Sequence, residues 1–231
     1  METLTVGDLA FEVRRSARRR AMQITVDRGG ELLFTAPTVC PEDVMAAFVR
    51  EKRMWILTKL AEKEALRTEV PPKQFVSGEG FPYLGRSHRL LVVDAQDVAL
   101  KLEHGRFKLR RDAVRDGRAE LLRWYTAHAE AWLTARVEQW QHRVGVEPAG
   151  VHVRELGFRW GSCGRGAKLY FHWRTILLPP RIAEYVVVHE LVHLAEAHHT
   201  PAFWTRVERA LPDYAVKKQW LAERGIEVAG V

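Results

Sequence analysis

His189, Glu190 and His193 have the residue types and the spacing that can bind a metal ion and activate water. The two histidines are four residues apart, so on a helix their rings lie one turn apart and can bind the same ion. Glu190 directly follows the first histidine, which places its carboxylate beside the ion, where it can accept a proton from water. His199 follows His193 by six residues and is the candidate third ligand. The pattern predicts a metal-dependent hydrolase, with Zn²⁺ or another divalent metal as its cofactor.

The same spacing can also arise by chance in a chain with 10 histidines among 231 residues. The surrounding segment favours the metal site, because residues 182–195 are apolar on nearly every side and predict a buried helix. Buried histidines and a buried glutamate need partners, and one bound cation would supply a partner for all of them.

The composition is that of a globular chain. Its 231 residues are 47% hydrophobic, enough for one large domain or two small ones. The apolar runs are shorter than the ~20 residues of a membrane span and no secretion signal is recognisable, so we expect a cytoplasmic protein with no membrane partner. Cys40 and Cys163 lie far apart, which argues against a disulfide framework and against a thiolate zinc site.

The charge balance is basic. Lys and Arg number 36 against 29 acids, a net charge of +7, and the isoelectric point is about 9.6. Such a balance suits polyanionic partners, including nucleic acid. The basic residues are mostly mixed with acids, except in residues 14–20, which hold five arginines, and in residues 101–123. Nucleic acid is therefore a candidate partner through these two segments.

The first half of the chain predicts a β-rich region, residues 1–111, with one long helix. Polar and apolar residues alternate over the first forty positions, with a turn at 27–30, as in a β meander. Pro41 and two acids then predict the start of a helix that continues over 44–66 and stops at Pro71 and Pro72. Short strands are expected at 90–93, 98–102 and 107–109.

The second half, residues 112–231, predicts a metal-binding catalytic domain, so the fold class is α+β. A helical stripe runs from Asp112 to Gly145, and strands at 151–156 and 169–173 flank a glycine-rich loop at 160–166. Pro180 fits the first position of the motif helix, and further helices follow Pro201 and Pro212. Candidate substrate-binding residues are placed along the loop and on one face of the second strand: Trp160, Tyr170, His172 and Arg174.

At this point the sequence resembles a known family. The run V-V-H-E-L-V-H-L-A-E-A-H-H-T-P-A-F-W at 187–204, with W-G-S-C at 160–163 and W-R at 173–174, is similar to the YgjP-like metal-dependent hydrolases of bacteria. That family is distantly similar to SprT-like and WLM-type zinc peptidases. The segments 14–36 and 75–86 also resemble the family, so nearly the whole chain is covered. The resemblance implies a compact zincin-like helical half with a short antiparallel sheet, His189, His193 and His199 as ligands, and Glu190 as the catalytic acid/base.

Two histidines depart from the family pattern, because His198 and His172 stand where we expect Asn. His198 leaves two candidates for the third ligand side by side. The spacing favours His199, since a ligand six residues after His193 requires the helix to end and the chain to turn back, as in the metzincin pattern. The glycine of that pattern is absent, and Glu196 takes its place. If the helix continued instead, a later acid, Glu208 or Asp213, would be the alternative.

The sequence leaves several functions open. A metallopeptidase is the first hypothesis, with residues 169–173 as an edge strand for an extended peptide. The second is a nucleoside triphosphate pyrophosphohydrolase acting on a substrate such as UTP, which the basic balance favours. No phosphate-binding G-x-x-x-x-G-K-[ST] loop is present. The third is a DNA-associated protease of SprT-like type, and the fourth is a structural metal site with four protein ligands.

Overall fold

The computed structural model describes residues 2–26, 30–65, 73–157 and 159–225. The chain divides into two compact units, residues 1–69 and residues 70–231. This boundary lies before the expected one at residue 111, because the strands between residues 80 and 110 share a core with the second half of the chain. Among the described helices, none combines the length and the apolar character needed to cross a bilayer.

The first unit is a four-stranded sheet followed by a helix. Its strand order is β1-β2-β4-β3, and β2 pairs with β4 in parallel. The expected meander is therefore wrong in connectivity, because β4 inserts between β2 and β3. The elements are β1 (Glu2–Val6), β2 (Leu9–Ser16), β3 (Gln23–Val26), β4 (Leu32–Pro37) and α1 (Glu42–Ala65).

Helix α1 begins at Glu42, as its acidic first turn predicts, since carboxylates favour a helix N-terminus. It buries Met45, Val49 and Ile56 in a core that also contains Phe11 and Phe34 of the sheet. Its expected end at residues 71 and 72, and most of the turn at 27–30, lie outside the described residues.

The second unit begins with another four-stranded sheet, ordered β5-β6-β8-β7 with β6 and β8 parallel. Backbone hydrogen bonds tie its first turn to a later segment, because the N–H groups of Leu84 and Gly85 donate to the carbonyls of Ile176 and Leu177 at 2.8 and 3.1 Å. The strands are β5 (Gly80–Tyr83), β6 (Arg86–Val93), β7 (Leu100–Glu103) and β8 (Arg106–Arg110).

The long helix α2 (Gly117–Val144) follows a 3-10 segment, η1 (Arg111–Asp116). It begins later than the expected start at Asp112, because residues 111–116 form these tighter turns. Its predicted stripe is buried, including Tyr125, Leu133 and Val137. Gly145 ends the helix at φ 76°, a left-handed conformation that glycine adopts without strain, and its N–H donates to the carbonyl of Gln141.

A three-stranded sheet precedes the motif helix, in the order β10-β11-β9. It is mixed, because β11 pairs antiparallel with β10 and parallel with β9. Strand β11 is therefore central, so the expected peptide-binding edge at 169–173 is wrong and β10 is an edge of this sheet. The elements are β9 (Gly150–Arg154), β10 (Gly161–Cys163), η2 (Arg165–Ala167), β11 (Lys168–His172) and η3 (Trp173–Leu177).

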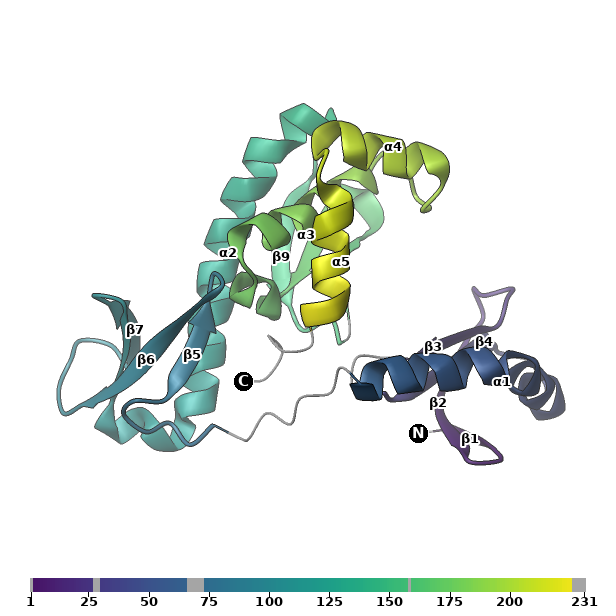
Figure 1. The fold of residues 1–231 in the computed structure, drawn as a ribbon, viewed down its shortest axis with the longest axis horizontal. Coiled ribbons are helices and arrows are strands. Elements are labelled where there is room, and N and C mark those ends of the chain that lie inside the picture. The colour runs from purple at the N-terminus through teal and green to yellow at the C-terminus, as the bar shows by residue number, and fades with distance from the viewer. Residues whose placement is uncertain (1, 27–29, 66–72, 158, 226–231) are drawn as a thin grey trace. The chain divides into compact units, whose positions relative to one another are not determined.

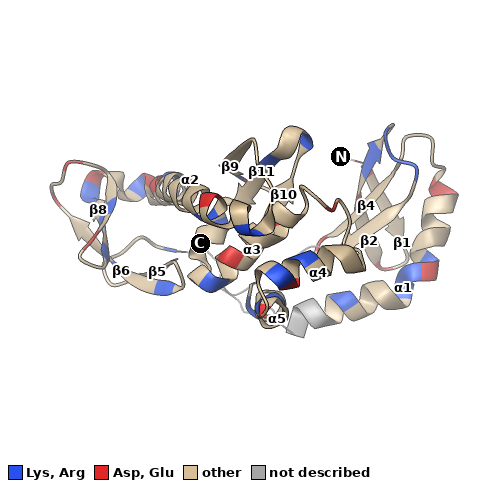
Figure 2. Ribbon diagram, turned by 90° about the horizontal axis from the view of Figure 1, so that it is seen from above, with Lys and Arg blue, Asp and Glu red and all other residues tan. Residues whose placement is uncertain are grey.

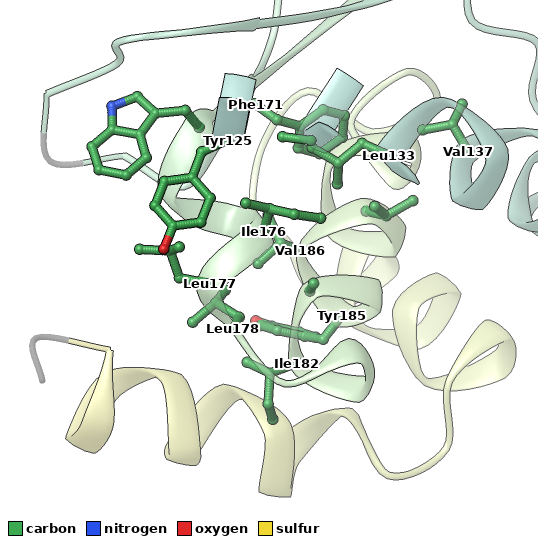
Figure 3. Packing of buried hydrophobic residues seen from close by; sticks show 14 of the residues in the cluster. Tyr125, Leu133, Val137, Phe171, Ile176, Leu177, Leu178, Ile182, Tyr185 and Val186 are labelled. Carbon is green, nitrogen blue, oxygen red and sulfur yellow. The ribbon is translucent and has the colours of Figure 1, made fainter. Parts of the chain in front are cut away.

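Three helices complete the second unit: α3 (Pro180–Val192), α4 (Pro201–Ala210) and α5 (Tyr214–Arg224). Helix α3 begins at Pro180, as predicted, and packs against α2, β10, α4 and α5 (Figure 1). Its side chains Ile182, Tyr185 and Val186 lie among those of η3 and α2 in one continuous core (Figure 3). This packing fixes α3, which carries the His-Glu-x-x-His motif.

Candidate metal centre

The chain bends sharply after the motif helix. Helix α3 ends at Val192, and His193 occupies its C-cap. The next helix has a well-formed start, because the Thr200 side chain accepts a hydrogen bond from the Phe203 N–H at 3.3 Å and Pro201 occupies the first turn. The bend between the two helices returns His199 to the end of α3.

Three imidazole rings converge at this bend. The Nε2 atom of His199 lies 3.0 Å from Nε2 of His189 and 3.1 Å from Nε2 of His193. Three nitrogens at ~2.1 Å from a tetrahedral zinc ion would be about 3.4 Å apart, so small movements would admit the ion. In the described part of the chain, these histidines are a group of donors close enough to hold a metal ion.

The three histidines are neutral at neutral pH, which is the form that binds metals. Burial lowers the pKa of His189 to about 3, and the nearby charges of His193, His199 and Lys218 act in the same direction. Burial also lowers the pKa values of His193 and His199. The Nδ1 atom of His193 lies 3.0 Å from the carbonyl of Glu196, an arrangement that assigns the proton to Nδ1 and leaves Nε2 free to bind.

Aromatic side chains of α4 support the three rings. The ring of Phe203 is fully buried, and its centroid lies 4.5 Å from that of His193, 4.8 Å from that of His199 and 5.0 Å from that of His189. The ring of Trp204 stacks on His199 at 5.6 Å between centroids. These contacts limit the rotation of the imidazoles, so α4 helps to keep the donors together.

Glu190 is buried beside the cluster and held by strand β10. Its side chain accepts a hydrogen bond from the backbone N–H of Cys163. A Cβ at Gly161 would lie 2.6 Å from the Glu190 Cγ and 2.7 Å from its Oε1, so the carboxylate fits only because this residue is glycine. Burial raises the pKa of Glu190 to about 8, although the Cys163 N–H and the charge of Arg159 oppose the shift.

The outer edge of β10 faces this carboxylate. The Trp160 carbonyl accepts from the His172 N–H and the Gly164 N–H donates to the Lys168 carbonyl, both at 2.8 Å. Hydrogen-bonded and non-bonded positions alternate in an antiparallel pair, so Gly161 and Cys163 direct their backbone groups away from β11. The bond from Cys163 to Glu190 agrees with this orientation.

The structure places His172 in a polar network of its own. Its ring is fully buried, with Nε2 at 2.5 Å from Oε1 of Glu155. Its Nδ1 accepts a hydrogen bond from the Arg174 N–H at 3.0 Å, which caps η3. An Asn at this position could cap the segment in the same way, so either residue suits the start of η3. Both ring nitrogens thus have partners outside the histidine cluster.

The other expected substrate residues differ in their surroundings. Arg174 belongs to η3, so it does not share a strand face with Tyr170 and His172. Tyr170 stacks on His152 and carries the guanidinium of Arg154 over its ring at 4.0 Å. Trp160 is partly buried against the main core. The described contacts of Tyr170 and Arg174 give no link to the histidine cluster.

The alternative third ligands lie apart from the cluster. His198 is exposed and is not in the donor group, although its charge lowers the pKa values of its neighbours His193 and His199. Asp213 pairs with Lys217 at 2.5 Å, and Glu208 is exposed on α4. Because α3 ends at Val192, the chain turns back and His199, beyond the bend, lies against His189 and His193.

Two exposed cations near the centre escaped the sequence analysis. Lys218 of α5 places its Nζ 4.0 Å from the centroid of the Trp204 ring, and its charge lowers the pKa values of His189 and His199. Arg159 precedes β10, donates to Oγ of Ser162 at 3.3 Å, and acts on Glu190 through its charge. In the sequence both are ordinary surface residues, and only the fold brings them to the site.

The two basic segments contain many ion pairs. Arg14 pairs with Glu12 at 2.8 Å, and Arg15 pairs with Glu2 at 2.9 Å. Around β8 and along α2, Lys and Arg lie among Asp and Glu (Figure 2), and the pairs there join Lys101 to Asp97, Lys108 to Glu103, Arg110 to Asp112, Arg111 to Asp94 and Arg123 to Glu120. These pairs reduce the number of free cations, and binding to nucleic acid stays a prediction that salt-dependent binding would test.

Comparison with known proteins identifies the family. No curated protein and no solved structure was found to match the chain. The profile of the YgjP-like metallopeptidase domain matches residues 20–224, which includes the histidine cluster, Glu190, and most of both compact units. A metal-dependent hydrolase with a divalent cation agrees with the three neutral imidazoles and the buried carboxylate. The chain therefore belongs to the YgjP-like family of metallopeptidase-domain proteins.

Proposed function

We propose that the protein is a zinc-dependent metallopeptidase whose ion is held by His189, His193 and His199. The observation that carries the proposal is the position of the His199 Nε2 atom, which lies within 3.1 Å of the Nε2 atoms of both His189 and His193, while Glu190, the residue after His189, is buried. When bound at three protein ligands, zinc supplies a Lewis acid that polarises the attacked carbonyl and makes water acidic enough to react at neutral pH.

Glu190 is the proposed general base. Its carboxylate would accept a proton from the attacking water and donate it to the leaving nitrogen. The Cys163 N–H and the absence of a side chain at Gly161 position this group. Because Glu190 is buried, the orientation of its carboxylate is set by the surrounding protein.

An extended peptide could pair with the edge of β10. Gly161 lies directly at the Glu190 carboxylate and directs its backbone groups away from β11. A substrate strand hydrogen-bonded there would place its peptide bonds close to the general base. This geometry favours a peptide over a small substrate with no backbone.

A nucleoside triphosphate pyrophosphohydrolase is the alternative function. The exposed cations Lys218 and Arg159, near the histidines and near Glu190, favour it because both suit phosphate oxygens. A fluorogenic peptide library and UTP or ATP, assayed side by side on the zinc-loaded protein, distinguish the two reactions. Peptide cleavage without pyrophosphate release supports the peptidase, and the reverse result rejects it.

The general base is tested by Glu190→Gln. We expect peptide hydrolysis to fall by about 10²- to 10⁴-fold, the usual contribution of a general base, while elemental analysis still finds one zinc ion per chain. The matched control is Glu184→Gln, on the same helix but paired with Arg136 at 3.7 Å, which should retain wild-type activity. Full activity in Glu190→Gln would reject the mechanism.

The third ligand is tested by a pair of neighbouring substitutions. His199→Ala should weaken zinc binding by at least about tenfold, because it removes one of three donors. His198→Ala should leave zinc affinity unchanged, since this side chain is outside the donor group. Competition with a chromogenic chelator measures both affinities. Equal losses in the two variants would contradict the assignment.

A further inference from the structure

Lys218 holds an unusual position for an exposed lysine. Its Nζ lies over Trp204, whose ring in turn stacks on His199, with the two ring planes at 20°. In the described residues, no carboxylate forms an ion pair with Lys218. The ammonium group is thus held by an aromatic face, a contact that places a cation without neutralising its charge.

The next residue along the chain shows the contrast. Lys217 is buried and pairs at 2.5 Å with Asp213, the N-cap residue of α5. Its charge is satisfied within the protein. Lys218 is exposed, faces Trp204, and has no such partner in the described chain. Two consecutive lysines therefore have different roles, one structural and one open to solvent at the candidate centre.

An unneutralised cation beside a metal site is electrostatically costly. Lys218 is separated from His199 by a single aromatic ring, because Trp204 contacts both side chains. A bound divalent cation would repel the same ammonium group. An anionic group supplied by the substrate would relieve this repulsion, because it would interact favourably with each of these positive charges.

We propose that Lys218, seated on Trp204 beside His199, forms a subsite that binds an anionic group of the substrate next to the bond that is cleaved. This inference rests on the proposed peptidase function, in which the anionic group is the carboxylate of an acidic side chain or of a peptide C-terminus. The same subsite chemistry would accept a phosphate, so the experiment must distinguish the two sources.

The test compares matched peptides that differ only in Glu against Gln, at each position within two residues of the cleaved bond. Wild-type protein should cleave the best Glu peptide about fivefold more efficiently in kcat/KM, the upper range for an exposed ion pair. Lys218→Met keeps the packing on Trp204 and should abolish the preference. Lys218→Glu should reverse it towards a Lys peptide. Arg209→Met, which removes an exposed cation of α4, is the matched control and should keep the preference.

A binding measurement separates recognition from turnover. Calorimetry with the zinc-loaded Glu190→Gln variant should show the same preference for the Glu peptide, and raising the ionic strength should weaken it. Equal binding and cleavage of the Glu and Gln peptides by wild-type protein would overturn the subsite and leave the peptidase function intact. A preference that persists in Lys218→Met would also overturn it.

An assay with UTP shows whether the anionic group that Lys218 binds is a carboxylate or a phosphate. Pyrophosphate release from UTP that falls in Lys218→Met but not in Arg209→Met, with no peptide cleaved, would keep the anionic subsite and reject the peptidase function. If the zinc-loaded protein neither binds nor hydrolyses the peptides or UTP, both proposals fail.

Discussion

The chain builds the same sheet topology twice, in two different settings. Strands β1 to β4 and strands β5 to β8 each consist of two hairpins joined by a central parallel pair, with the orders β1-β2-β4-β3 and β5-β6-β8-β7. Each sheet is followed by a long helix, α1 or α2. The topology alone therefore does not create a functional site, since the histidine cluster follows the second copy only.

The difference lies in what each sheet packs against. The first sheet and α1 form a core of their own, built around Phe11, Phe34 and Ile56. The core of the second sheet continues through Tyr125 of α2 into η3 and α3, and includes Phe203 beneath the histidines. Tyr125 stacks on Trp173 at 6.0 Å and donates to the Pro82 carbonyl at 2.6 Å. The second copy thus shares its core with the candidate centre, and the first copy has a core of its own.

The largest effect is expected from two matched substitutions that would each create a cavity in one of the two cores. Phe34 and Phe107 are fully buried on the corresponding central strands β4 and β8. Replacing either with Ala should cost about 3 to 5 kcal/mol of unfolding free energy. Phe107→Ala should also weaken zinc binding, because its ring contacts Tyr125 and Trp124, whereas Phe34→Ala should not. Hydrogen exchange read by mass spectrometry, with chelator competition, locates each loss. Weaker zinc binding in Phe34→Ala alone would contradict the comparison.

Metal loading should sharpen the same contrast. Zinc at 100 times its dissociation constant should stabilise the second unit by about 2.7 kcal/mol, because only the folded chain assembles the three donors. The first unit should show unchanged protection against hydrogen exchange. A chelator should reverse the gain, and His199→Ala should lack most of it. Equal protection of both units by zinc would show that they do not fold separately.

The two hairpin turns offer a subtler comparison. Gly7 and Gly85 both have positive φ, 64° and 74°, so Ala at either position should cost about 1 to 2 kcal/mol. A Cβ at Gly85 would also lie 2.7 Å from the Cα of Pro179, at the start of α3, whereas at Gly7 the nearest atom is a flexible arginine end at 3.4 Å. Gly85→Ala should therefore cost at least about 1 kcal/mol more than Gly7→Ala. Urea denaturation of both variants measures this difference, and equal costs would contradict it.

The smallest effect concerns pH. Burial raises the pKa of Glu155, but hydrogen bonds from Trp173 and His172 and the charge of Arg174 outweigh it and hold the pKa below 4.5. A lowered pKa in the folded state stabilises the protein above pH 4.5, and this gain disappears as the pH falls through the folded value. The Glu155→Gln variant should lose less stability on acidification, by under about 1 kcal/mol because the group is largely exposed. Melting temperatures from pH 7 to pH 3 test this, and parallel curves would count against it.

The local elements and the donors could be predicted from the sequence. The start of α3 at Pro180, the end of α2 at Gly145 and the helix after Thr200 each follow from residues with one strong conformational preference. The spacing of the histidines predicted a shared ion, and their Nε2 atoms converge. Such features depend on residues that are close together in the chain, so a single sequence is enough to predict them.

Pairings between distant segments could not be predicted in the same way. Alternation identifies a strand but does not name its partner, so the parallel pairs β2 with β4 and β11 with β9 were missed, as was the edge position of β10. The pattern also made His172 a substrate-binding candidate, whereas its ring pairs with Glu155, which follows β9 and is distant in the sequence. Lys218 joined the centre only through the packing of α5 on α3.

The hydrogen bond from Cys163 to Glu190 is donated by the main chain, and this determines which substitutions near Glu190 the protein can tolerate. Any residue except proline supplies the same N–H, so the requirement on this position comes from its side chain, which packs partly buried against the core. Two residues earlier, where a single methyl group would meet the carboxylate, no such freedom exists.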